Sequence, residues 1–62
     1  MADREIIIDM LNDALAKEIM AEKNCQQILN LAKDKKVKSI VKKIKNDELQ
    51  HQELVKRLLA MI

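Results

Sequence analysis

Apolar residues recur along the chain at alternating steps of three and four, with one short charged interruption near the middle. This spacing is typical of helices that turn one apolar stripe towards a neighbouring helix. We therefore predict a first helix over about residues 3–32 and a second over about 36–61, with Asp3 and Asp34 as their N-caps. Two long helices joined by a short turn form an antiparallel hairpin, so residues 1–62 are expected to be one all-α domain.

Each predicted helix carries a seam of positions at which we expect the two helices to meet. The seam of the first helix is Ile8, Leu11, Leu15, Glu18, Glu22, Cys25, Leu29 and Ala32; that of the second is Val37, Val41, Ile44, Glu48, His51, Val55, Leu58 and Ile62. Further apolar residues widen both stripes beyond what one partner helix covers. Two hairpins are therefore expected to pair as a homodimer and form a four-helix bundle.

Four seam positions are polar, and they fall in two adjacent layers. Folding the hairpin about its turn places Glu22 beside Glu48 and Glu18 beside His51, with apolar layers above and below. An enclosed carboxylate is costly unless something neutralises it, and one imidazole cannot balance three glutamates. A divalent cation can, and carboxylate oxygen with imidazole nitrogen suits iron, manganese or zinc.

Two-fold symmetry makes this ligand set more specific. Each hairpin offers Glu18 from one helix and the pair Glu48-x-x-His51 from the other, and the i, i+3 spacing points both members of the pair the same way. Two hairpins then present two single glutamates and two Glu-x-x-His pairs, which is the ligand set of di-iron and di-manganese carboxylate bundles. The sequence thus predicts a metal site built from Glu18, Glu48 and His51 and shared across the dimer.

Two neighbouring residues have open roles. Asp47 lies four residues before His51, so its carboxylate could orient the imidazole or another ligand, or it could be an exposed charge. Cys25 is expected to be an apolar-behaving core thiol. Its nearness to the polar layers leaves a redox or soft-ligand role open.

Composition excludes several other classes of protein. The chain has no glycine, proline or aromatic residue, which argues against β-rich folds, Rossmann domains, P-loops and base-stacking surfaces. A single cysteine cannot form an internal disulfide or a CxxC zinc site. A chain of 62 residues rarely stabilises itself by more than ~3–5 kcal/mol without a metal or a partner. No apolar run suits a membrane span or a signal peptide, so we expect a cytoplasmic protein.

Residues 33–45 carry seven lysines and one aspartate. A solvated face is the simpler interpretation, and a basic end that contacts nucleic acid or an acidic partner is the functional one. The second interpretation gives an alternative to the metal site: a non-enzymatic, dimeric helical-hairpin binding module. Such a module would be similar in size and architecture to the small plasmid-copy-number RNA-binding bundles, with an affinity for RNA that falls steeply as salt rises.

Two stretches resemble the ferritin-like superfamily in its rubrerythrin and encapsulated-ferritin branches: Glu18-Ile19-Met20-Ala21 followed by Cys25, and Asp47-Glu48-Leu49-Gln50-His51. The family pattern is a glutamate, an alanine three residues later and an aromatic residue at seven, then Asp-Glu-x-x-His on the next helix. The resemblance covers roughly residues 8–62. Cys25 departs from it by standing where the family carries an aromatic residue.

The resemblance implies a ferroxidase-like di-iron protein that oxidises Fe(II) with oxygen or peroxide. Glu18, Glu48 and His51 would be the catalytic residues and the iron ligands, with two irons held at the interface of a dimer of hairpins. Glu22 would then be a supporting residue or an alternative ligand, or else part of a solvated face. No encapsulin-targeting extension follows Ile62, so residence in a protein shell is not expected.

Overall fold

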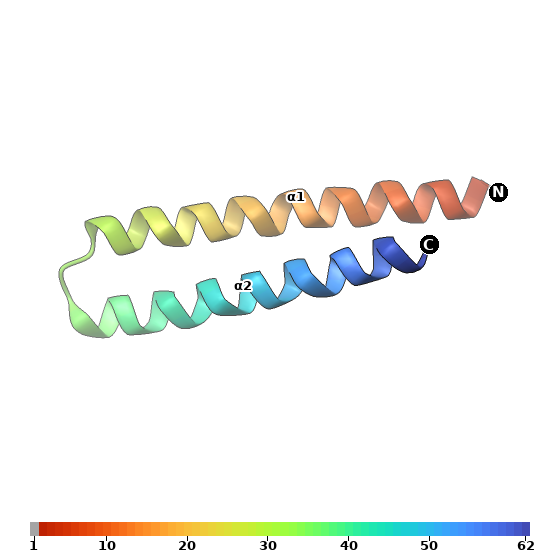
Figure 1. Cartoon of the computed structure of the whole chain (residues 1–62). Helices are drawn as coiled ribbons and strands as arrows, with labels where there is room; N and C mark the ends of the chain where they lie inside the picture. Colours follow the sequence, from red (N-terminus) through yellow and green to blue (C-terminus); the bar gives the residue numbers. More distant parts are fainter. Residues whose placement is uncertain (1) are drawn as a thin grey trace.

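A computed structural model describes residues 2–62 and consists of two antiparallel helices. Helix α1 spans Ala2–Leu31 and helix α2 spans Lys35–Met61, with only residues 32–34 between them. The chain is an elongated hairpin in which the start of α1 and the end of α2 lie together, opposite the turn (Figure 1). The predicted all-α hairpin is confirmed, and the observed helix ends agree with the predicted ones to within about one residue.

The turn is set by Asp34, as the sequence predicts. Its backbone is extended, and its Oδ1 accepts hydrogen bonds from the backbone N–H groups of Lys36 at 2.7 Å and Val37 at 3.4 Å. These bonds satisfy donors that have no partner inside the first turn of a helix. The predicted N-cap at Asp3 is wrong, because α1 already begins at Ala2. Asp3 lies within the first turn, where its negative charge favours the helix dipole.

The seam of α1 lies at the helix interface as predicted, and the seam of α2 is partly different. All eight predicted seam residues of α1 are buried or half-buried. On α2 the residues that are buried or half-buried are Lys38, Val41, Lys45, Glu48, Gln52, Val55, Leu59 and Ile62. The prediction of Val37, Ile44, His51 and Leu58 as seam residues of the hairpin is therefore wrong, since all four are exposed. Long lysine side chains can pack their methylene groups in a seam while the ammonium group stays in water, so hydrophobicity alone did not locate this seam.

The four exposed residues of α2 that the sequence placed in the seam belong to a surface that we call the open apolar face. It is made by the heptad row Val37, Ile44, His51 and Leu58 of α2 and by the row Ile7, Ala14, Ala21 and Ile28 of α1, of which the two alanines are half-buried and the other six residues are exposed. Counting about 100° per residue around two antiparallel helices places both rows on the same side of the hairpin. His51 is the only polar member of either row.

One hairpin leaves much of its surface uncovered. Cys25 and Val41 are the buried apolar residues of the described chain. The accessible surface is 5161 Å² for 7.2 kDa, compared with about 4,100 Å² for a compact protein of this mass. The dimensions are 50 × 15 × 11 Å. Across residues 2–62, neither helix combines the length and the apolar character needed to cross a membrane.

Candidate metal centre

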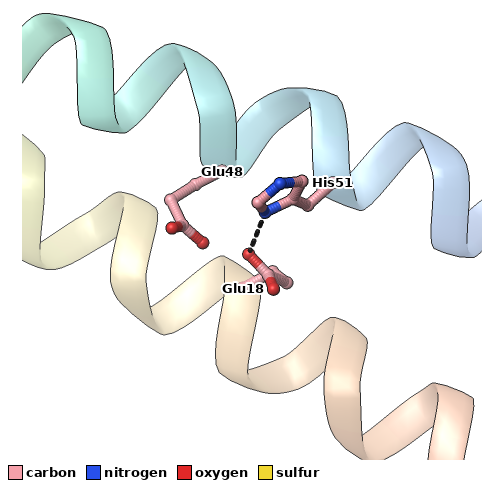
Figure 2. Close-up of side chains that lie close together, drawn as sticks. All are labelled: Glu18, Glu48 and His51. Carbon is pink, nitrogen blue, oxygen red and sulfur yellow. Dashed lines mark hydrogen bonds and ion pairs between the residues drawn. The ribbon is translucent and has the colours of Figure 1, made fainter.

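Three side chains converge midway along the hairpin on one edge of the helix interface. Glu18 extends from α1, and Glu48 and His51 extend from successive turns of α2 (Figure 2). One ligand atom from each residue lies within 4.8 Å of the other two. Nδ1 of His51 is 3.4 Å from Oε2 of Glu18, so the predicted layer that pairs these two residues is confirmed.

The chemistry and the spacing of these atoms fit a divalent transition metal. Two carboxylate oxygens and one imidazole nitrogen are donors that suit iron, manganese or zinc. Ligand atoms bound at about 2.1 Å on opposite sides of a metal are about 4.2 Å apart, so a small movement of the side chains would close the site around an ion. Three ligands from one chain also leave further coordination positions open. The role of Glu18, Glu48 and His51 as metal ligands stays a prediction.

The two carboxyl groups perturb each other in opposite directions. Their side-chain hydrogen bond lowers the pKa of Glu18 and raises the pKa of Glu48. Desolvation works against the first shift and adds to the second, and nearby His51 favours the ionised form of both groups. Two carboxyl groups this close ionise in separate steps, Glu18 before Glu48, and a bound metal ion would favour the ionised form of both.

This pairing gives a prediction for the titration of the site. We expect Glu48 to become half-protonated above the ordinary glutamate pKa of 4.5 and Glu18 below it. Because a metal ligand must be ionised, metal affinity should rise as pH rises through the raised pKa of Glu48. Carbon-13 NMR of the carboxyl groups measures both titrations in metal-free protein. Coincident titration of the two groups would contradict the opposite shifts of their pKa values.

Glu22 does not join the cluster. Nε2 of Gln52 donates to Oε1 of Glu22 at 3.0 Å and lies 3.5 Å from the backbone carbonyl oxygen of Glu18. The carboxylate of Glu22 therefore pairs with Gln52, and the predicted layer of Glu22 with Glu48 stays a prediction. The carboxylate of Glu22 is thus linked through Gln52 to the backbone of Glu18 and is not among the converging ligand atoms.

Gln52 is the site residue that sequence reasoning missed. It is the most buried polar residue of the described chain, with 6% of its surface exposed. The signal that could have located it is its spacing: it follows Glu48 by four residues and shares a heptad row with Lys38, Lys45 and Leu59. A polar residue between His51 and Glu53 gave no apolar signal, so the pattern did not single it out.

Replacing Gln52 by alanine is expected to lower the free energy of unfolding by about 1–3 kcal/mol, because Glu22 loses its amide donor in a half-buried position. Gln50→Ala is the matched control, since Gln50 is exposed on the same helix and should change stability by less than about 0.5 kcal/mol. Urea unfolding at one fixed protein concentration measures both variants. Equal effects would show that the Gln52–Glu22 hydrogen bond contributes nothing specific.

Asp47 and Cys25 have more limited roles than the ligands. No hydrogen bond joins Asp47 to the cluster within the described residues, and its charge contributes to the raised pKa of Glu48. The predicted orientation of His51 by Asp47 has no support in these contacts, since Nδ1 of His51 faces Glu18. Cys25 is a free, buried thiol, which agrees with the core role predicted for it.

Comparison of the chain with protein-family models, with curated proteins and with solved structures gives no match.

Proposed function

We propose that this chain is a di-iron carboxylate protein that oxidises Fe(II) with oxygen or peroxide, at a site that two hairpins complete. The observation that supports the proposal most directly is the convergence of Glu18, Glu48 and His51. These residues come from two helices and 33 positions of sequence separate Glu18 from His51, so local spacing alone does not explain their meeting.

A second hairpin would complete both the site and the fold. His51 has 54% of its side chain exposed and Glu18 has 26%, so the site is open on one side in a single hairpin. His51 also lies within the open apolar face, whose other members gain from being covered. A two-fold axis through this face would bring two copies of the cluster together, giving four carboxylates and two imidazoles for two metal ions.

Each residue has a distinct task in this arrangement. Glu18 and Glu48 would offset the charge of bound Fe(II), and the ion would favour the ionised form of Glu48. His51 would supply a ring nitrogen as the third ligand, and its Nδ1 already faces Glu18. Each Fe(II) substrate ion loses one electron to the oxidant, and the apolar rows around the site keep bulk water away from it.

The alternative, a non-enzymatic module that binds RNA or an acidic partner, is supported by the lysine-rich stretch alone. It gives no reason for two carboxyl groups and an imidazole to meet at mid-height of the hairpin. We therefore favour the metal site.

Anaerobic titration with Fe(II) tests the proposal. We expect about one iron to bind per chain, and a ferric absorption band to develop when oxygen or peroxide is added. Elemental analysis of protein purified without chelators provides an independent measure of the resident metal. The ferroxidase assignment would be refuted if the protein bound no Fe(II) at micromolar concentration. It would also be refuted if neither oxygen nor peroxide oxidised the bound Fe(II).

A further inference from the structure

A hollow of about 430 Å³ lies between the two helices near the turn, apart from the metal centre. We call it the lysine groove. It is lined by Gln26 and Asn30 of α1 and by Lys38, Lys42, Lys45 and Asn46 of α2, together with two leucines. Its volume lies within the range of pockets that hold small molecules.

The groove concentrates positive charge without any carboxylate in its lining. The ion pairs of the described residues are Asp13–Lys17, Glu18–His51 and Glu53–Lys56. None of these pairs involves a lysine of the groove. Lys38 and Lys45 are moreover half-buried, so their stems are held at the groove while their ammonium groups stay in water. An anion that enters the groove would meet these charges without a competing carboxylate.

The lysine at one end of the groove is held in place by neutral groups. Nζ of Lys45 donates to Oε1 of Gln26, whose Nε2 donates to Oδ1 of Asn30 at 2.9 Å. These contacts position the ammonium group but leave its charge uncompensated. Lys38, Lys42 and Lys45 follow the axis of α2, and the outer two are about 10 Å apart along it. One phosphate cannot contact all three lysines, whereas an extended chain of phosphates can.

We infer that the lysine groove binds a short linear polyphosphate, with Lys38, Lys42 and Lys45 contacting successive phosphate groups. The amide groups of Asn30 and Asn46 add donors without charge. The chain has no aromatic residue on which a base could stack, so the site favours a bare phosphate chain over a nucleic acid. The groove opens on the side opposite the open apolar face, so pairing of two hairpins through that face leaves it accessible.

Calorimetric titration with sodium triphosphate tests this inference. The parent should bind triphosphate at least tenfold more tightly than inorganic phosphate. Its affinity for triphosphate should fall as salt rises from 50 to 200 mM, with the slope of log affinity against log salt that about three lysine–phosphate contacts give. The variant K38Q/K45Q should lose at least tenfold in affinity for triphosphate. The control K36Q/K43Q removes the same charge from exposed lysines of the same helix outside the groove, and should lose less than twofold.

Equal losses in the two double variants would overturn the inference, because they would show a diffuse basic surface rather than a site. So would a parent that binds triphosphate no better than phosphate, or an RNA oligomer of equal charge that binds more tightly and displaces triphosphate.

Circular dichroism checks the helix content of each variant. If K38Q/K45Q is unfolded, the single variants K42Q and K43Q replace the two double variants. Both positions are exposed, but only Lys42 lines the groove, so only K42Q should lose affinity for triphosphate. Since the groove contains no metal-centre residue, Fe(II) binding by a folded K38Q/K45Q should be unchanged, and the two proposals can fail separately.

Discussion

Replacing Glu18 by alanine is expected to weaken Fe(II) binding by at least about a hundredfold and to abolish the ferric band. Glu18 lies 3.4 Å from His51 and hydrogen-bonds to Glu48, so its loss removes one proposed ligand and the side chain that the other two face. Mutation of residues that merely support metal ligands already lowers metal affinity by about 10–100-fold, so loss of a ligand should lower it further. Anaerobic titration followed by addition of oxygen measures both effects.

Glu53→Ala is the matched control for this variant. Glu53 is an exposed glutamate of α2, two residues beyond His51, with its carboxylate 3.8 Å from Lys56 and outside the cluster. This change should leave Fe(II) binding within about twofold, since surface ion pairs of this kind contribute little. A Glu18→Ala protein that is folded and still binds and oxidises iron like the parent would show that the cluster is not the metal site.

The second large effect is expected from Leu58→Glu, which should split the proposed dimer and remove most iron binding with it. Leu58 is 46% exposed and lies one heptad after His51 in the open apolar face. A carboxylate there would be buried twice in a two-fold interface, once from each copy, without a partner of opposite charge. We expect the dissociation constant of the dimer to rise at least about a hundredfold, about 2.7 kcal/mol. Sedimentation equilibrium over a range of concentrations measures it.

Leu31→Glu makes the same chemical change at a position outside the open apolar face. Leu31 is 81% exposed at the last residue of α1. It should leave the mass of the assembly and the iron stoichiometry unchanged. A parent protein that sediments as a monomer while binding one iron per chain would contradict the shared site, and would place the complete metal centre within one hairpin.

The sequence allowed the helices and the turn to be predicted because local chemistry decides them. A chain without glycine or proline offers few places for a helix to end, and Asp34 supplies an acceptor for the N–H groups of the next helix. The convergence of Glu18 and His51 was also predictable, because the register of a hairpin follows from the position of a three-residue turn. The face of α2 that packs on α1 was harder to predict, since the apolar stripe of α2 is wider than one helix can cover.

The ambiguity on α2 has a physical origin. The row of Val37, Ile44 and Leu58 is more apolar than the row of Lys38, Lys45 and Gln52, yet the second row faces α1. An apolar pattern identifies residues that gain from burial but not which neighbour buries them. Lysine stems and a hydrogen-bonded glutamine are compatible with a half-buried seam, so the most apolar row can remain outside. Gln52 is such a residue, since its amide donates to Glu22 at 3.0 Å.

The direction of the hairpin has a practical consequence for experiments on this protein. The lysine groove lies near the turn, whereas the beginning of α1 and the end of α2 lie together at the far end of a body 50 Å long (Figure 1). A fluorophore or surface tether attached at either of these ends would therefore be remote from bound polyphosphate. Immobilised protein would present its turn outwards, which suits surface-based affinity measurements without redesign of the chain.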